Sequence, residues 1–154
     1  MSGNKRIAKE LADITRSPPD GMKVSLIDES DIHKWQILMD GPPLSPYAGG
    51  TFTLHLVLPS DYPFKPPTLS FRTKIYHPNI TNDDKGSMCL GMLRAEEWKP
   101  SSKISAVLDF ARQLLVEPMP EDAVEAGIAQ LYREDRKEWE KRAKGWTKTW
   151  AVRV

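Results

Sequence analysis

The only cysteine of the chain, Cys89, stands in a segment rich in residue types that take part in acyl-transfer chemistry. The run His77-Pro78-Asn79 precedes it in the same segment. A cysteine thiolate is a nucleophile, an imidazole can accept a proton, and a primary amide can donate a hydrogen bond to an oxyanion. Free cysteines are also common as small core residues, so a lone cysteine near a histidine is a weak signal by itself. Cys89 is therefore either an inert apolar residue or a nucleophile able to form a thioester.

The cysteine and histidine content limits the other kinds of site. One cysteine cannot form an internal disulfide, and His33, His55 and His77 have no zinc-finger spacing with it. No glycine-rich phosphate loop of the Walker type is present, so we do not expect the chain to activate a carboxylate with a nucleotide itself. Any acyl group is expected to arrive already activated, and we expect no metal and no cofactor.

The elements that would position Cys89 begin with a predicted helix and four predicted strands. Ile7, Leu11 and Ile14 recur at i, i+4 and i+7 among polar residues, which predicts an amphipathic helix that ends before Pro18. Strand-like stretches separated by turn-forming residues follow, at residues 22–27, 34–39, 51–58 and 68–71. Successive strands of this kind indicate an antiparallel meander.

A long loop comes next in the predicted order. The apolar periodicity lapses over residues 75–100, where proline, asparagine, aspartate and glycine accumulate. Long irregular segments in small domains usually carry function. Cys89 and the His77-Pro78-Asn79 run both lie in this loop, which makes it the predicted active-site loop.

Helical patterns return in the C-terminal third of the chain. Apolar spacing predicts a helix over residues 104–115 after a Ser101-Ser102 cap region. Asp122 and Glu125 have the spacing of a capping box, which predicts the start of a third helix at Asp122. A tryptophan-rich stripe with i, i+4, i+7, i+11 spacing is expected to dock a last helix on the core, through Trp139, Ala143, Trp146 and Trp150.

Chain length and net charge predict the number of domains, the kind of partner and the location. A chain of 154 residues can bury one core, so we expect one domain over residues 1–154, of α+β class. With 22 basic and 21 acidic residues the net charge is +1, which favours neither nucleic acid nor a membrane as a partner. The N-terminus is charged and no apolar run reaches membrane-spanning length, so we expect a cytoplasmic or nuclear location.

Six short motifs, taken together in their order, carry a resemblance to a known family. They are Ser45-Pro46-Tyr47-Ala48-Gly49-Gly50, Asp61-Tyr62-Pro63-Phe64-Lys65-Pro66-Pro67, His77-Pro78-Asn79, Cys89, Trp98-Lys99-Pro100 and Pro118-Met119-Pro120. In order and approximate spacing, and on a matching run of elements, the chain resembles the ubiquitin-conjugating enzymes over roughly residues 5–150. The resemblance implies an N-terminal helix, a four-stranded antiparallel meander sheet, a long active-site loop and then C-terminal helices.

The resemblance also implies an activity and a set of partners. Cys89 would accept ubiquitin or a ubiquitin-like protein from an activating enzyme as a thioester, and would pass it to a substrate lysine or to a ligase cysteine. The implied partners are therefore ubiquitin or a relative, the activating enzyme, ubiquitin ligases and protein substrates. The ATP of the pathway would be used by the activating enzyme. The chain linkage, the ligase and the substrates are left open.

Three further residues each have a catalytic and a structural interpretation. Asn79 could donate to the oxyanion or brace its loop, and the two roles are compatible. The resemblance gives His77, with Pro78, a structural role in the turn, and a base beside the thioester could activate water and waste the acyl group. Asp122 matches the family's acidic residue near the cysteine, where it could orient a lysine amine and receive its proton; its structural alternative is a helix N-cap.

The same resemblance places a shared surface for activating enzymes and ligases on three short segments. Its members are Lys5, Arg6, Lys9, Pro63, Phe64, Lys99 and Pro100. An exposed phenylalanine beside prolines suits a small binding hot spot. The alternatives are that Phe64 belongs to the core and that the basic residues form a solvated helix face.

The chain also departs from the family pattern. The stretch from Asn79 to Cys89 is slightly long, an extra residue precedes Trp98, and Gly91 and Ala123 replace residue types that are frequent there. Asp109 is expected where the family often presents an apolar contact to the carried ubiquitin. These departures leave the loop geometry and the choice of ligase open.

Two alternative functions are considered. Cys89, His77 and Asn79 are the residue types of a cysteine hydrolase, but His77 is in a turn-forming segment beside a proline and is poorly suited to activate the thiol. An inactive relative that only binds ubiquitin would be expected to have lost the cysteine, and Cys89 is present.

Overall fold

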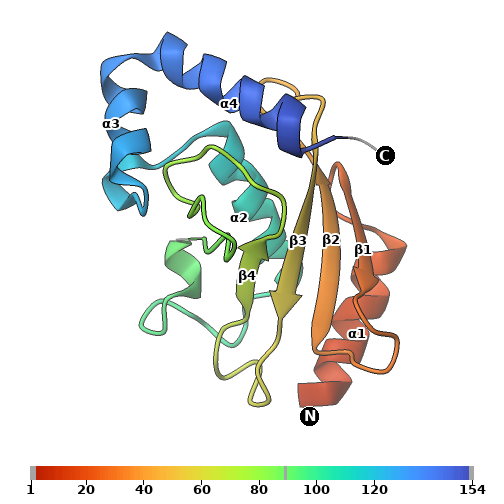
Figure 1. Ribbon diagram of the computed structural model, residues 1–154. Helices are drawn as coiled ribbons and strands as arrows, with labels where there is room; N and C mark the ends of the chain where they lie inside the picture. The colour runs from red at the N-terminus through yellow and green to blue at the C-terminus, as the bar shows by residue number, and fades with distance from the viewer. Residues whose placement is uncertain (1–2, 89, 153–154) are drawn as a thin grey trace.

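Residues 3–88 and 90–152 are described by the computed structural model of the protein (Figure 1). Its elements in chain order are α1 (Gly3–Arg16), β1 (Met22–Leu26), β2 (Lys34–Asp40), β3 (Thr51–Val57), β4 (Thr68–Phe71), the 3-10 helix η1 (Gly91–Leu93), α2 (Ile104–Val116), the 3-10 helix η2 (Pro120–Asp122), α3 (Ala126–Glu134) and α4 (Arg136–Trp150). The predicted order of one helix, four strands, a long loop and C-terminal helices is confirmed. Strand boundaries differ from the predicted ones by at most one residue.

The four strands form one antiparallel sheet in the order β1-β2-β3-β4, as predicted. Strand β3 buries every second residue, which is the pattern of a sheet with one face on a core. The register pairs Ile37 with Leu54 and Met39 with Phe52, so buried side chains face each other across neighbouring strands. Cross-strand pairs of this kind are the unit of sheet stability.

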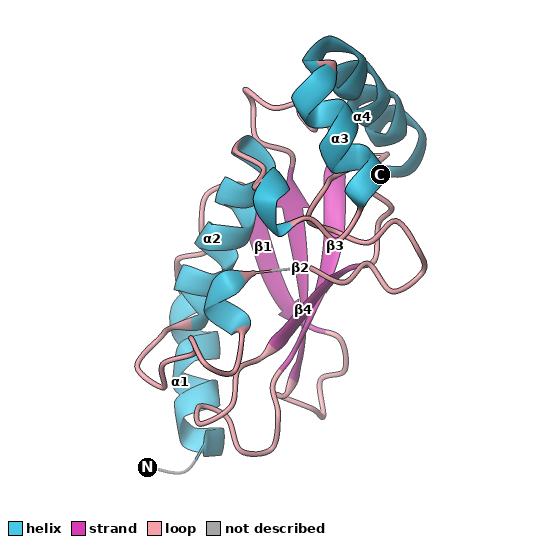
Figure 2. Cartoon of the chain, turned by 90° about the vertical axis from the view of Figure 1, so that its left-hand side faces the viewer, coloured by secondary structure: helices cyan, strands magenta, loops and turns pink. Residues whose placement is uncertain are grey.

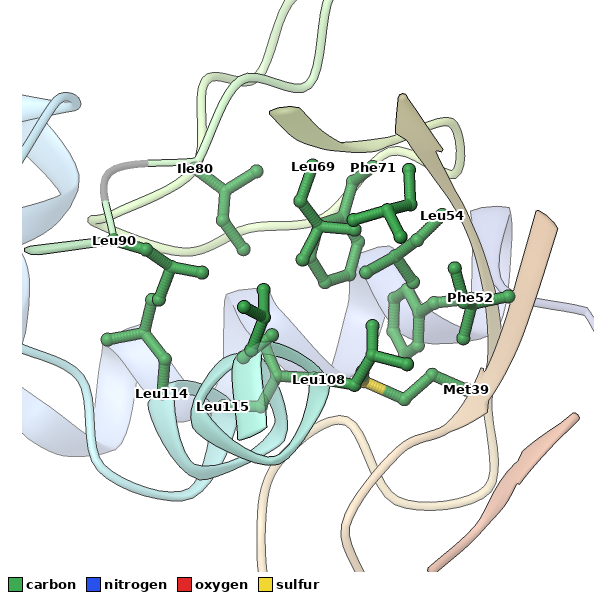
Figure 3. Packing of buried hydrophobic residues seen from close by; sticks show 14 of the residues in the cluster. Met39, Phe52, Leu54, Leu69, Phe71, Ile80, Leu90, Leu108, Leu114 and Leu115 are labelled. Atoms are coloured by element: carbon green, nitrogen blue, oxygen red, sulfur yellow. The ribbon is translucent and has the colours of Figure 1, made fainter. Parts of the chain in front are cut away.

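One face of the sheet is covered by helices. Figure 2 shows α1 and α2 on the same side of the sheet, and α3 and α4 at one end of it. Figure 3 shows Leu108 and Leu115 of α2 in the same packed cluster as Met39 and Phe52 of the sheet. The same cluster includes Ile80 and Leu90, which come from the long loop on either side of Cys89. The core therefore anchors the loop that carries the candidate nucleophile.

The start of the third helix was predicted wrongly. Asp122 lies in η2, and α3 begins at Ala126 with Glu125 at its N-cap and no side-chain capping bond. The backbone N–H groups of Val124 and Glu125 donate to the carbonyl oxygen of Pro78 at 2.9 and 3.1 Å. These bonds hold the residues after η2 in an extended conformation, so the helix starts four residues later than the capping pattern indicates. The structural alternative for Asp122, a helix N-cap, is therefore excluded.

The start of α2 also differs from the prediction. The N-cap is Lys103, and neither Ser101 nor Ser102 caps the helix. The first N–H, that of Ile104, donates instead to the Glu10 carboxylate of α1 at 2.9 Å. An acidic group at a helix N-terminus is stabilising, because it satisfies an unpaired donor and faces the positive end of the helix dipole.

Helix α4 docks through part of the predicted tryptophan stripe. Trp139 and Ala143 are buried, and Trp146 is half-buried with its ring 5.4 Å from the ring of Tyr76. Trp150 is 48% exposed and lies under the ammonium of Lys74, at 4.7 Å. The stripe is therefore core at its beginning and surface at its end. Within the described residues, no helix is both long enough and apolar enough to cross a membrane.

Candidate active site

The His77-Pro78-Asn79 turn is buried where the long loop meets the C-terminal end of α2. The backbone N–H of Asn79 donates to Nδ1 of His77 at 3.0 Å. Because that nitrogen accepts, Nε2 must carry the proton, and it lies 2.8 Å from the carbonyl oxygen of Leu114. The imidazole thus joins the turn to α2.

Burial decides the charge of His77. Desolvation lowers the pKa of its imidazole to about 4, although the hydrogen bond to Leu114 opposes the shift. The ring is therefore neutral near pH 7, and both of its nitrogens already have partners. A group in this state neither accepts a proton readily nor reaches a reacting atom, so the geometry fits a structural role for His77 rather than that of a general base.

The side chain of Asn79 forms hydrogen bonds with the segment around η2. Its Oδ1 accepts from the N–H of Met119 at 2.9 Å. Its Nδ2 donates to the carbonyl oxygen of Met119 at 2.8 Å and to that of Asp122 at 3.3 Å. The bond to Asp122 is the longer of the two and is the one that an oxyanion could replace. The bracing role is thus present in the geometry, and a donor role requires the exchange of one bond.

Asp122 faces the segment that follows Cys89. Its Oδ1 lies 3.8 Å from Nη2 of Arg94, the residue after η1, and both side chains are partly exposed. Ala123, where the family often has proline, is half-buried directly after η2. The sequence places Asn79 and Asp122 far apart, and the structure brings them into contact. Cys89 itself lies outside the described residues, between Met88 and Leu90.

The long stretch between Asn79 and Cys89 is organised by Asp83. Its Oδ1 accepts from the hydroxyl of Thr81 at 2.8 Å and from the N–H groups of Lys85 and Gly86 at 3.0 and 3.2 Å. These bonds, first among them that from Thr81, lower the pKa of Asp83. Gly86 has φ +56°, and a Cβ there would lie 1.8 Å from the carbonyl oxygen of Phe71. Only glycine fits this position, so the loop has one defined course against β4.

A shallow groove of about 440 Å³ runs beside this loop. It is lined by Pro67, Thr68, Leu69, Ser70, Ser87, Met88, Leu90, Leu93 and Arg94. Met88 and Leu90 are the sequence neighbours of Cys89, so the groove passes next to the segment of the thiol. Among residues 3–88 and 90–152, no three histidine, cysteine or acidic side chains come together in a way that could hold a metal ion.

Comparisons with known proteins agree with this architecture. Residues 6–147 match the model of a family described as ubiquitin-conjugating enzyme. The chain belongs to the ubiquitin-conjugating enzyme family. It is 42% identical, over 151 residues, to the ubiquitin conjugating enzyme E2 B of Dictyostelium discoideum, and the match covers 98% of this chain and 99% of that protein. A solved ubiquitin-conjugating enzyme E2 domain from Toxoplasma gondii superposes with a TM-score of 0.86 at 39% identity, covering 96% of this chain and 98% of that one.

The segments assigned to partner binding lie together at one end of this ubiquitin-conjugating fold. Nε1 of Trp98 donates to the carbonyl oxygen of Pro63 at 2.7 Å, which joins the 98–100 segment to the loop after β3. Phe64 is 77% exposed, so the alternative that it belongs to the core is excluded. Lys99 and Pro100, which follow Trp98 in the chain, are also exposed.

Arg6 differs from the other basic residues of α1. Its guanidinium donates to the carbonyl oxygens of Pro100 and Ser102, the latter at 2.8 Å, and pairs with Glu10 at 3.2 Å. Lys5 and Lys9 are exposed on the same helix. Arg6 is therefore committed mainly to linking α1 to the 98–102 segment, and Lys5 and Lys9 are the more accessible cations.

The sequence analysis missed Glu10 and Tyr62. Besides its bonds to Arg6 and Ile104, Glu10 accepts from the Tyr62 hydroxyl at 2.6 Å, and burial together with this bond raises the pKa of Tyr62 well above its usual range. The available signal was the position of Glu10, an acidic residue three after Ile7 and four before Ile14, on the apolar face of the predicted helix. A carboxylate there must have internal partners.

One further expectation concerns Asp109, and one further structural residue is Tyr47. Asp109 is exposed on α2, beside the partly exposed Phe110, so a carboxylate does stand on that surface. Tyr47, within the first proline-rich motif, is buried and donates its hydroxyl to the carbonyl oxygen of Tyr76 at 2.6 Å. Tyr47 thereby holds the residue that precedes the His77-Pro78-Asn79 turn, and its ring lies 5.8 Å from the ring of His77. The motif alone gave no sign of this role.

Proposed function

We propose that Cys89 accepts the C-terminal carboxyl group of ubiquitin, or of a ubiquitin-like protein, from an activating enzyme as a thioester. It then passes the acyl group to a substrate lysine or to a ligase cysteine. The observation that carries the proposal is the contact between the braced His77-Pro78-Asn79 turn and the Asp122 segment, beside the loop that contains the only cysteine. Family membership supports it.

The proposed charging step is an exchange of one thioester for another. The Cys89 thiolate attacks the carbonyl carbon of the thioester on the activating enzyme, and a tetrahedral oxyanion forms. Collapse expels the thiolate of the activating enzyme and leaves the acyl group on Cys89. The activating enzyme uses the ATP, so the conjugating chain, acting as one catalytic domain over residues 1–154, needs no cofactor of its own.

The proposed transfer step depends on Asn79 and Asp122. A lysine amine attacks the Cys89 thioester, the carbonyl oxygen becomes an oxyanion, and the Cys89 thiolate leaves. Asn79 braces the η2 segment, and its longer bond to the Asp122 carbonyl can be exchanged for one to the oxyanion. The Asp122 carboxylate orients the incoming amine and receives its proton. Neutral, buried His77 activates no water, which protects the thioester from hydrolysis.

The groove beside the loop is the proposed binding site for the C-terminal tail of the carried ubiquitin. Its volume of about 440 Å³ and its apolar lining by Leu69, Met88 and Leu90 suit an extended tail that ends at the residue between Met88 and Leu90. The exposed segments around Phe64 and Lys99 are the proposed docking surface for the activating enzyme and for ligases. A cytoplasmic or nuclear location, where a free thiol stays reduced, suits this chemistry.

A charging assay tests the proposal directly. The wild-type protein is incubated with activating enzyme, ATP and ubiquitin, and the products are separated on gels with and without reductant. We expect an adduct that reductant removes and that Cys89→Ala does not form. If neither ubiquitin nor ubiquitin-like proteins give such an adduct, the chain is a binding module and the thioester proposal is wrong.

We expect the ion pair between Arg94 and Asp122 to slow the transfer of the acyl group to lysine. Since Arg94 competes with the incoming amine for the Asp122 carboxylate, Arg94→Ala should speed discharge of the charged protein to free lysine. An exposed pair is worth roughly 0.2–1 kcal/mol, so the gain should be about 1.4- to fivefold and should shrink as salt is added. Asp122→Asn should slow discharge, and adding Arg94→Ala to it should change nothing further. A gain that persists in the double variant would contradict this role of the pair.

A further inference from the structure

Helix α4 has two chemically different faces. Its buried residues are Trp139, Ala143 and Thr147, and the helix lies along one end of the molecule (Figure 1). At 100° per residue, residues 137, 141, 144 and 148 fall within one narrow stripe that runs along the helix away from this buried face. All four are lysines, and all four are exposed. We call Lys137, Lys141, Lys144 and Lys148 the lysine row.

The arginines of α4 are used within the protein, whereas the lysine row is not. Arg142 pairs with Glu138 at 3.2 Å, and Arg136 donates to the Tyr132 carbonyl while its guanidinium lies 3.5 Å from the centre of the Tyr132 ring. In the described part of the chain, no carboxylate oxygen lies within 4.0 Å of an ammonium group of the row. The row therefore presents four charges to solvent.

The row concentrates charge in a protein that is otherwise nearly balanced. Helix α4 has six basic and two acidic residues, while the whole chain has a net charge of +1, so the remainder of the chain is net acidic. Lysines at i, i+3 and i+4 repel one another and destabilise a helix by roughly 0.2–0.5 kcal/mol per neighbouring pair. An external counter-charge would convert this repulsion into attraction.

We propose that the lysine row is a docking site for an acidic segment of a partner protein. The row is about 16 Å long at a rise of about 1.5 Å per residue, which an extended run of about five residues can span. Lysine ammonium groups act as point charges and accept carboxylates in any orientation, unlike the fixed fork of arginine. A short stretch rich in aspartate and glutamate therefore matches the row in length and in charge.

The surroundings of the row favour a protein segment over nucleic acid. Recognition of single strands uses aromatic side chains on which bases stack, and recognition of duplexes relies heavily on arginine forks. The three tryptophans nearest the row in the chain are engaged elsewhere. Trp139 is buried in the core, Trp146 packs against Tyr76, and Trp150 lies under Lys74. The arginines of α4 are already engaged within the protein, Arg142 by Glu138 and Arg136 by Tyr132. The row also forms a single line and not a broad basic surface.

The position of the row permits docking during catalysis. Helix α4 lies at the end of the molecule opposite the N-terminus of α1 and the loop after β3, as both ribbon views agree (Figures 1 and 2). Those two elements carry Lys5, Lys9 and Phe64, the proposed surface for the activating enzyme and ligases. An acidic segment on α4 therefore leaves that surface open. The inference itself does not depend on the chemistry of Cys89.

Direct binding of acidic peptides tests the proposal. Fluorescein-labelled glutamate peptides of two, five and eight residues are titrated with the full chain, and anisotropy is recorded at low and at physiological salt. We expect affinity to rise from two to five residues and then to level off, because five residues span the row. The affinity for the longer peptides should fall steeply with salt, since the charges are exposed.

Matched variants identify the site. The quadruple variant Lys137→Gln, Lys141→Gln, Lys144→Gln and Lys148→Gln should bind the five-residue peptide about tenfold more weakly, as expected for four exposed ion pairs. Glutamine is a good helix former, so α4 should keep its structure. Replacement of the same four lysines by arginine should preserve binding. The control removes four exposed lysines elsewhere, Lys23, Lys34, Lys85 and Lys103, and should change the affinity less than twofold.

Three outcomes would overturn the proposal. An equal loss in the control variant would mean that net charge alone, and not the row, governs binding. If the affinity keeps rising between the five- and eight-residue peptides, the binding site is longer than the lysine row. Tighter, row-dependent binding of a 20-base-pair DNA duplex or of phosphatidylserine vesicles at physiological salt would assign the row to a different class of partner. Ubiquitin charging should be unchanged in the row variants, because none of the four lysines belongs to the proposed catalytic machinery.

Discussion

The polar side chains of the His77-Pro78-Asn79 turn are satisfied almost entirely by the protein itself. His77 bonds to Leu114 and to the backbone of Asn79, and Asn79 bonds to Met119 and Asp122. The partners outside the turn, Leu114, Met119 and Asp122, all lie on or after α2. At the scale of single residues, the turn fixes the segment that presents Asp122. In the proposed mechanism, the direct chemistry is left to Cys89, to Asp122 and to one exchangeable bond of Asn79.

Asn79→Ala is expected to lower both stability and transfer. It leaves the Met119 N–H and the Met119 and Asp122 carbonyls without their present partner, so the free energy of unfolding should fall by about 2 kcal/mol, measured by urea denaturation. Discharge of the charged variant to free lysine should slow by about a hundredfold or more if Asn79 also donates to the oxyanion.

The matched control for Asn79 is Asn82 in the same loop. Asn82 is exposed and uses its backbone N–H, not its side chain, to bond to Glu125. Asn82→Ala should therefore change the free energy of unfolding by less than about 0.5 kcal/mol. A destabilised Asn79→Ala protein that discharges at the wild-type rate would restrict Asn79 to bracing.

His77 makes stability depend on pH on the acidic side. Its pKa is about 4 in the folded protein, below the usual value near 6.5, so the unfolded chain binds more protons between these two values. Stability should therefore be unaffected by His77 above pH 6.5 and should fall as the pH drops toward 4, by about 1.4 kcal/mol per pH unit. Urea denaturation at a series of pH values measures this slope.

The contribution of His77 can be separated from that of the carboxyl groups with His77→Gln. Glutamine can donate and accept as the neutral imidazole does, but it does not titrate. The variant should lose stability more slowly than the wild type between pH 6.5 and 4.5. Parallel slopes for the two proteins would show that His77 is not the group that remains neutral.

At the scale of elements, local pattern was sufficient for most of the secondary structure. The helix through Ile7 and Ile14, the meander and α2 were predicted because each depends on periodicity within a few residues. The motifs also predicted which loop carries the candidate site. These features are local, and the sequence contains them directly.

The misplaced features depend on contacts between distant segments. The start of α3 is set by the Pro78 carbonyl, and the N-terminus of α2 is satisfied by Glu10 rather than by a nearby serine. The contact of Asn79 with Met119 and Asp122 likewise joins residues that periodicity cannot relate. Short-range capping rules fail where a distant group already occupies the cap.

Glu10 is expected to be the largest single link between elements at this end of the fold. It joins α1 to the Tyr62 hydroxyl and to the first N–H of α2. Glu10→Ala leaves these donors unpaired and should lower the free energy of unfolding by about 2–3 kcal/mol. The control Asp13→Ala removes an exposed ion pair with Arg16 on the same helix and should cost less than about 1 kcal/mol. Equal losses in thermal or urea denaturation would refute the role given to Glu10.

At the scale of the whole molecule, three surfaces are spatially separate. The loop of Cys89, with η1 and η2, lies between the end that carries Phe64 and the end formed by α4 (Figure 1). In the proposed function the chain has to meet an acyl donor, a ligase and a substrate, and separate surfaces would allow two of these partners to be present together. Changes at either end should therefore affect partner binding without altering the intrinsic reactivity of the thioester.

Phe64 provides the test of that separation. Its side chain is 77% exposed and buries little surface in the free protein, so Phe64→Ala should change the free energy of unfolding by less than about 0.5 kcal/mol. An exposed aromatic residue at the centre of an interface is typical of a hot spot, and its loss should slow ligase-stimulated transfer by about tenfold or more. Discharge to free lysine without a ligase should remain at the wild-type rate, because Phe64 lies away from the loop of Cys89. The control Leu44→Ala, at another strongly exposed apolar residue, should leave both rates unchanged. If Phe64→Ala slows the ligase-free reaction as much as the stimulated one, the docking surface and the catalytic loop are coupled, and the two ends of the molecule do not act independently.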